Sequence, residues 1–154
     1  MRLDTFAEFM SNYHKDGFLH ESGEMHKQLI YHLANGDNAY FSESNIDFLK
    51  FNTGKLSDDP LRQAQNLMIA VCSVCSHIAI LCNVNSEFSL SLADYYIQLT
   101  QNMRTRESIS PYFRNVFLHY CDIIKKYQQV PYTHTIHRIT NYIYDHIYAP
   151  VTVN

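Results

Sequence analysis

Apolar residues recur at spacings of three and four along most of the chain, a period typical of amphipathic helices. Near the N-terminus, Phe6, Phe9 and Tyr13 have this spacing and predict a helix over residues 3–13. The same spacing predicts helices over residues 24–34, 37–51, 91–103 and 110–127. Only the short stretch 151–153 alternates as a strand does. The pattern therefore predicts an all-α fold, a compact bundle of about seven helices.

The most apolar segment, about residues 60–82, is expected to be the central helix of this bundle. Asp59 can accept the free N–H groups at its start, and Pro60 is preorganised for a first helical turn. Residues 61–82 are apolar nearly all round, so the other helices are expected to surround them. The most apolar stretch, residues 67–82, has 16 residues, fewer than the roughly 20 that cross a bilayer, so no membrane span is expected.

A last helix is expected between Pro131 and Pro150. Its apolar stripe consists of Ile136, Ile139, Tyr142, Ile143 and Ile147. We therefore divide the chain into a helical body, residues 1–130, and a linker with one further helix, residues 131–154.

Composition supports a folded domain, and charge is unevenly distributed. Hydrophobic residues make up 46% of the chain, which is enough for a core, and its four Gly and four Pro argue against a turn-rich β-sandwich. Residues 1–99 carry 6 Lys/Arg and 12 Asp/Glu (net −6), whereas residues 100–154 carry 6 and 3 (net +3). The basic final third indicates that this end works near an anionic partner. The polar N-terminus lacks a signal-peptide pattern, so a cytoplasmic protein is expected.

The cysteines offer the first candidate chemistry. Cys72 and Cys75 form a CxxC motif in the middle of the predicted central helix. A redox motif belongs at a helix N-terminus, and a zinc site needs a second close pair of ligands. We therefore expect buried thiols that fill the core, and keep a cysteine-based redox or metal sensor as an alternative.

No pattern typical of an enzyme is present. His134 and His137 are three residues apart but lack an HExxH motif, and there is no phosphate loop or nucleophile elbow. Surface or capping histidines are the simpler interpretation. We expect neither catalytic residues nor a cofactor or metal.

Polar residues among apolar neighbours form a possible buried network or effector pocket. Arg62 and Asn66 are one turn apart on the central helix, and a buried charge needs a partner, so we expect one of them to pair with Asp94. The alternative is that all three lie at the surface. His77, Tyr95 and Tyr96 are the other residues that could line an effector pocket.

The C-terminal pattern resembles a known family. His134-x-Ile136-x-x-Ile139-x-x-Tyr142-Ile143-x-x-His146-x-x-x-Pro150-Val151-Thr152-Val153 is similar to the opening of the DNA-binding domain in AraC/XylS-type transcription regulators. In those proteins the first helix packs on a helix-turn-helix, and a threonine in the position of Thr152 caps the next helix.

A second stretch resembles the helical region before that domain in Firmicute-type members. It comprises residues 61–67, Ala79-Ile80 and residues 91–98, so that the two resemblances together span about residues 60–154. His77 stands where those relatives tend to carry Arg, and Cys82-Asn83 replaces a Gly-containing turn, so the role of that Arg cannot be carried over.

The resemblance implies the regulatory and dimerising portion of a transcription regulator. The groove-reading helices of the helix-turn-helix domain are expected beyond Asn154, so this chain alone should not bind an operator. It implies a homodimer that senses a small-molecule or peptide effector, with Ile136, Ile139, Tyr142 and Ile143 as the surface that couples to the DNA-binding domain. A stand-alone helical adaptor remains the other alternative.

Overall fold

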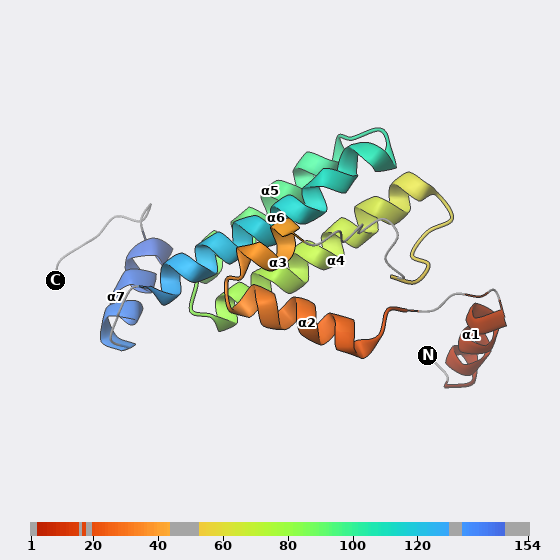
Figure 1. Cartoon of the computed structure of the whole chain (residues 1–154), viewed down its shortest axis with the longest axis horizontal. Coiled ribbons are helices and arrows are strands. Elements are labelled where there is room, and N and C mark those ends of the chain that lie inside the picture. Colours follow the sequence, from red (N-terminus) through yellow and green to blue (C-terminus); the bar gives the residue numbers. More distant parts are fainter. Residues whose placement is uncertain (1–2, 16, 18–19, 44–52, 130–133, 147–154) are drawn as a thin grey trace.

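The computed structural model describes residues 3–15, 17, 20–43, 53–129 and 134–146 of the chain. Seven helices form this part, and the prediction of an all-α fold is confirmed (Figure 1). They are α1 (Leu3–Lys15), α2 (Gly23–Ala34), α3 (Asn38–Glu43), α4 (Pro60–Leu81), α5 (Ser86–Gln101), α6 (Arg106–Gln128) and α7 (His134–Asp145). The β-structure of the described residues is a single isolated bridge between His20 and Thr53.

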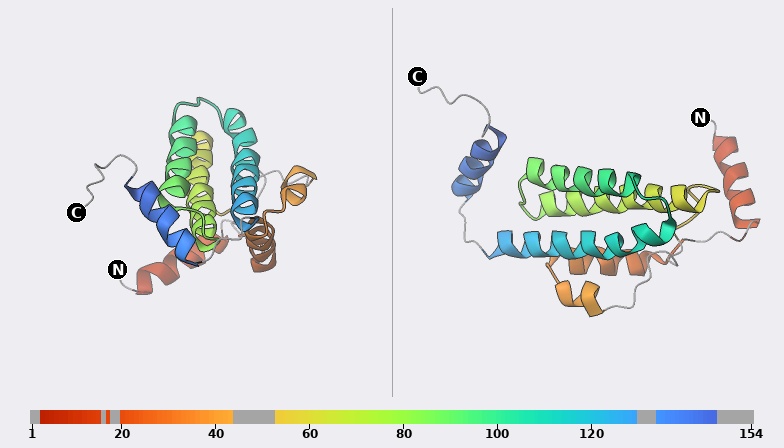
Figure 2. Two further views of the ribbon diagram at one scale, coloured as in Figure 1. Left: turned by 90° about the vertical axis from the view of Figure 1, so that its left-hand side faces the viewer. Right: turned by 90° about the horizontal axis from the view of Figure 1, so that it is seen from above.

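Three long helices, α4, α5 and α6, lie side by side and form the body of the molecule (Figures 1 and 2). Two hydrogen bonds fix the antiparallel register of α4 and α5: Gln65 Nε2 donates to the Thr100 carbonyl (3.4 Å) and Ser89 Oγ to the Ser76 carbonyl (3.0 Å). From the end of α5, helix α6 runs back along α4. Helix α2 lies against α4 and α6, and α3 contacts α6 and α2. The core therefore lies between α4 and α6 and is closed by α5 and α2.

Only one side of helix α4 faces the core. Asp59 Oδ1 accepts from the Arg62 N–H (2.8 Å), as the sequence predicts for the start of this helix. Met68, Cys72 and Cys75 are fully buried, but Val74 and Leu81 are 51% and 82% exposed. At 22 residues α4 is long and apolar enough to cross a membrane, so the length argument against a span was wrong. Its packing against α2, α5 and α6 is nevertheless that of a core helix.

Three helix boundaries differ from the prediction by more than two residues. Helix α5 begins five residues earlier, because Asn85 Oδ1 accepts from the Phe88 N–H (3.0 Å) and caps it. Helix α6 begins at Arg106, because Thr105 caps it, so Pro111 lies inside the helix. Helix α3 covers only the first part of the predicted 37–51 segment, and residues 44–51 lie outside the described residues.

Helices α1 and α7 lie at opposite ends of the bundle (Figures 1 and 2). Neither has an extensive contact with another helix in the described part of the chain. Helix α1 is linked to the segment before α4 by the Tyr13 hydroxyl, which accepts from the Lys55 N–H (2.6 Å). Helix α7 follows α6 and projects beyond its end. The expected linker, the stop at Pro150 and the 151–153 strand pattern fall outside the described residues.

Candidate functional site

The expected pairing of Asp94 with Arg62 or Asn66 does not form. The register of the two helices sets Asp94 at the level of Val71, nine residues from Arg62, or about 14 Å along the helix axis. Arg62 and Asp94 are both exposed, as in the surface alternative. Asn66 instead donates through Nδ2 to the Leu56 carbonyl (3.5 Å).

The other residues of the expected pocket also lie apart. His77 is exposed and its Nδ1 lies 2.7 Å from the Ser73 carbonyl of its own helix. Tyr95 is 58% exposed, whereas Tyr96 is buried with its hydroxyl 3.2 Å from His119 Nδ1. The contacts of these six residues lead to different partners, and none of the six lines the groove described next.

The structure has an apolar groove elsewhere, between α2 and α4. It encloses about 340 Å³, within the range of small-molecule sites. Along α4 its lining residues recur at helical spacing, as do those along α2, and Phe117 of α6 also lines it. The α4 residues are Leu67, Ala70, Val71, Val74 and Ile78, and the α2 residues are His26, Leu29, Ile30 and Leu33.

Local sequence explains why this groove stays open. Helix α4 has two adjacent apolar faces: one, with Met68 and Cys75, is buried in the core, and the next, with Ala70 and Val74, turns towards α2. Ala70 lacks the bulk that would fill the space between the helices. The apolar character of α4 all round therefore reflects a core face plus a half-exposed groove face.

Polar groups are few in the groove. His20, His26 and Thr53 are the polar residues that line it, and none of the lining residues is Asp, Glu, Lys or Arg. The His20–Thr53 bridge holds two of them together, and the His20 ring stacks on Tyr13 at 5.6 Å. Such a site suits a mainly apolar ligand or helix face with few hydrogen-bonding groups.

The apolar stripe of α7 is a second exposed surface. Its side chains are exposed to 42% (Ile136), 54% (Ile139), 63% (Tyr142) and 56% (Ile143). They lie within two turns of one helix face, because their spacing is three, three and one. The structure therefore leaves the expected coupling residues together and accessible.

The cysteines fill the core, as predicted. Cys72, Cys75 and Cys121 are fully buried. Burial raises the pKa of Cys72 and of Cys121 to about 12, and it raises that of Cys75 well above its ordinary value, with contributions from Cys72 and Cys121. These thiols are protonated at neutral pH, so they are poor nucleophiles and poor metal ligands. The described residues contain no cluster of three or more His, Cys, Asp or Glu side chains placed to hold a metal ion.

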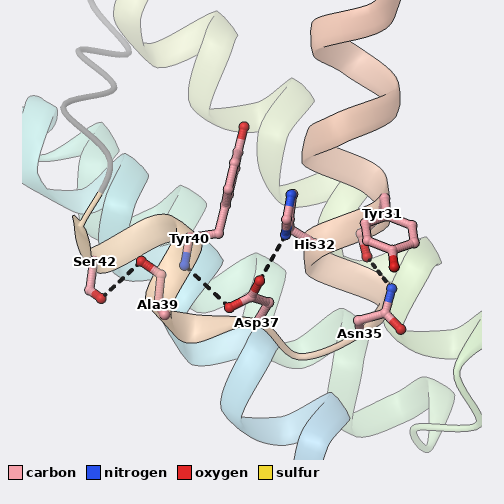
Figure 3. A network of polar contacts seen from close by, with 7 residues as sticks. All are labelled: Tyr31, His32, Asn35, Asp37, Ala39, Tyr40 and Ser42. Carbon is pink, nitrogen blue, oxygen red and sulfur yellow. Dashed lines mark hydrogen bonds and ion pairs between the residues drawn. The ribbon is translucent and has the colours of Figure 1, made fainter.

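A polar corner between α2 and α3 was not anticipated from the sequence (Figure 3). His32 Nδ1 lies 2.8 Å from Asp37 Oδ2, and the His32 ring stacks on Tyr40 at 3.8 Å. Asp37 Oδ1 also accepts from the Tyr40 N–H, at 3.3 Å. The hydrogen bond from His32, followed by that from the Tyr40 backbone, lowers the pKa of Asp37. These contacts fix the position of α3 relative to the end of α2.

Comparison with known proteins gives no further assignment. No protein-family model, no curated protein sequence and no solved structure matches this chain.

Proposed function

We propose that this chain is the signal-sensing regulatory part of a transcription regulator. Its partner is a helix-turn-helix domain that follows α7, and α7 is the element through which the two communicate. The resemblance of residues 134–153 to the opening of an AraC/XylS-type DNA-binding domain supports this assignment.

The observation that carries the proposal is the exposure of the α7 stripe. An amphipathic helix that belongs to its own domain core buries its apolar face there, but Ile139 and Ile143 are each more than half exposed. A contiguous exposed apolar surface marks an interaction site. In the proposed regulator, the helix-turn-helix domain covers this surface.

In this proposal the α2–α4 groove is the site that binds the signal. Its volume and apolar lining suit a small apolar effector with one or two hydrogen-bonding groups. An effector that binds one arrangement of α2 and α4 better than another shifts the population towards that arrangement. Helices α2 and α6 end together, since Gln128 Nε2 donates to the Ala34 carbonyl (2.8 Å), so a shift of α2 reaches the segment that leads to α7.

DNA-affinity selection with the product of the natural gene tests the proposal. The expected result is enrichment of paired half-sites by the wild-type product and loss of enrichment when Ile139→Asp is introduced in α7. Wild-type product that enriches no sequence contradicts the assignment to transcription regulation.

The groove also favours a second candidate function, a helical adaptor. The α2 and α4 residues that line it are spaced as in grooves that accept the apolar face of a partner helix. An adaptor needs no DNA, so peptide binding without DNA enrichment separates the two candidates. The buried thiols give no comparable support to a redox or metal sensor.

A further inference from the structure

A second hollow lies between α1 and the segment that precedes α4, at the end of the bundle where α2 and α4 begin (Figure 1). It measures about 360 Å³, and we call it the α1 hollow. Phe9, Asn12 and Tyr13 of α1 line one side of it, and residues 55–58 line the other. Unlike the α2–α4 groove, it carries a cationic side chain, that of Lys55.

The α1 hollow adjoins the α2–α4 groove. Leu56 lines both. The His20 ring, which lines the groove, stacks on the Tyr13 ring, which lines the α1 hollow, with 5.6 Å between ring centroids. A side chain at Gly54 would collide with both rings, so this glycine permits their close approach. An apolar groove and a polar hollow with a cation therefore meet at a shared wall.

The groove changes character along its length. Leu56 lies beside the start of α4, because its carbonyl accepts from Asn66 Nδ2 (3.5 Å). Thr53, three residues before Leu56, forms the isolated bridge with His20. At the other end of the groove, Ile78 belongs to the last turns of α4. The polar groups of His20 and Thr53 are therefore at the end that adjoins the α1 hollow.

The segment that carries Lys55 is already ordered in this structure. Gln63 Oε1 of α4 accepts from the Leu56 N–H (2.7 Å) and from the Ser57 N–H (2.8 Å). The Lys55 N–H donates to the Tyr13 hydroxyl, which ties the same segment to α1. Because the backbone of a preorganised site need not be ordered again, binding there has a lower entropic cost.

We propose that the effector is an anionic amphiphile, a single-chain carboxylic acid. Its apolar chain lies in the α2–α4 groove, and its carboxylate reaches Lys55 in the α1 hollow. The α4 residues that line the groove run from Leu67 to Ile78, a span of about 16 Å, which accommodates a chain of medium length. This inference rests on the proposed function in taking the groove as the effector site, and it adds the α1 hollow and the chemical class of the effector.

The distribution of polar groups favours this class over other effectors. A sugar or an extended peptide would bring many hydroxyl or amide groups into a groove whose polar lining residues are His20, His26 and Thr53. Polar groups that lose water without gaining a hydrogen bond are costly to bury. An acyl chain has none, and its charged group is at one end, as Lys55 is at one end of the groove.

The carboxylate of Asp58 forms an ion pair with the Lys55 ammonium in this structure. The Asp58 side chain is 90% exposed and that of Lys55 is 39% exposed, and exposed ion pairs contribute little stability. A ligand carboxylate can therefore take the place of Asp58, whose side chain then turns into water. Lys55 and Asp58 thus have opposite effects on the ligand, since one attracts its head group and the other competes with it.

Titration calorimetry of residues 1–154 with decanoate tests the position of the head group, with decanol as the uncharged probe of equal chain length. Lys55→Met removes the ammonium and keeps an apolar stem, and Asp58→Asn removes the competing charge. Lys27→Met is the matched control, because Lys27 is exposed and pairs with Glu24 (3.6 Å) but lines neither hollow. Circular dichroism checks that each variant is folded.

Val74→Glu tests the position of the chain. Val74 lines the groove and is 51% exposed, so the substitution should leave the fold intact. A charge there should weaken the binding of decanoate and of decanol at least about tenfold, because it must lose water beside the apolar chain. Unchanged binding of both probes to Val74→Glu would show that the chain lies elsewhere and would overturn the proposal.

The expected result is that the wild type binds decanoate more tightly than decanol. Lys55→Met should weaken decanoate at least about fivefold, and Asp58→Asn should tighten it about two- to fivefold. Neither substitution should change the Kd of decanol, and Lys27→Met should change neither probe. Absence of decanoate binding, an equal effect of Lys55→Met on both probes, or weaker decanoate binding to Asp58→Asn overturns the proposal.

These titrations contain no DNA, so the two proposals fail separately. Decanoate that does not bind leaves enrichment of DNA half-sites by the natural gene product open to its own test. Decanoate that binds as expected, with no DNA enrichment, would instead identify an amphiphile-binding protein and contradict the assignment to transcription regulation.

Discussion

The imidazole of His32 and the carboxylate of Asp37 face each other across the turn between α2 and α3, with 2.8 Å between Nδ1 and Oδ2 (Figure 3). The contact joins the last turn of α2 to the residue that precedes α3. Helix α3 in turn contacts α6, so this pair helps to hold α2 against the body.

The pair predicts a dependence of stability on acidic pH. The hydrogen bond from His32 lowers the pKa of Asp37 below its ordinary value of about 3.9. A carboxyl group whose pKa is lowered in the folded state contributes stability that is present above the unfolded pKa and is lost as pH falls through the folded pKa. Asp37→Asn should therefore lower Tm at neutral pH and flatten its decline below about pH 4, as measured by circular dichroism.

Asp94→Asn is the matched control for this experiment, because Asp94 is an exposed carboxylate on α5. Its melting curves should follow those of the wild type at each pH. Equal acid sensitivity in wild type and Asp37→Asn would contradict the stabilising role of the His32–Asp37 contact.

Gly36 should not tolerate a side chain. Its φ is +62°, and a Cβ there would lie 2.8 Å from Lys125 Cβ and 3.0 Å from the Cys121 carbonyl oxygen. The left-handed conformation alone costs a residue with a Cβ about 1–2 kcal/mol, and the contact with the α6 backbone adds to it. We expect Gly36→Ala to lower the free energy of unfolding by more than about 2 kcal/mol in urea titrations.

Gly23→Ala provides the comparison, because its added Cβ would meet nothing within 4 Å and its φ is not in the left-handed region. This change should be neutral or stabilising by up to about 1 kcal/mol. Similar losses in the free energy of unfolding for Gly36→Ala and Gly23→Ala would show that Gly36 is not constrained as described.

The Tyr120 hydroxyl should contribute to stability rather than to binding. It donates to the Ser89 carbonyl at 2.7 Å in the core, and burial is the main cause of its raised pKa. Tyr120→Phe should cost about 1 kcal/mol in the free energy of unfolding, whereas Tyr95→Phe, at a 58% exposed position, should cost less than about 0.5 kcal/mol. Equal losses in the free energy of unfolding for the two substitutions would show that the Tyr120 hydrogen bond does not add to stability.

Thiol labelling should divide the cysteines into two classes. Cys72, Cys75 and Cys121 are fully buried and Cys82 is partly exposed. In native protein at about pH 8, a thiol reagent should modify Cys82 first, and the other three only at the rate of unfolding. Rapid modification of Cys72 and Cys75 together would instead favour the redox-sensor alternative.

The periodicity of the sequence was sufficient to predict the helices, but polar core residues obscured some of their ends. Ser89 is fully buried and bonds the Ser76 carbonyl, so it belongs to the apolar face of α5. A serine in that position breaks the apolar pattern, which explains why the helix was expected to begin later. Side chains that satisfy a carbonyl of a neighbouring helix depend on contacts that the local sequence does not contain.

The groove could not be predicted for the same reason. Its two walls come from residues about forty positions apart, and only the packing of α2 on α4 brings Leu33 and Ile78 to one cavity. The α7 stripe, by contrast, is a local pattern, and its exposed side chains follow the expected spacing. A surface formed by one helix could thus be predicted from the sequence, whereas a surface shared by helices far apart in the sequence could not.

Hydrogen exchange of the α7 amides tests the central claim most directly. The chain of residues 1–154, diluted until it is monomeric, is compared with the full product of the natural gene, which under the proposed function carries a DNA-binding domain after α7. An isolated helix of 12 residues is marginal in water, so α7 amides should exchange rapidly in the first protein and be protected at least about tenfold in the second. Equal protection of α7 in both proteins would contradict the claim that this helix binds a DNA-reading partner.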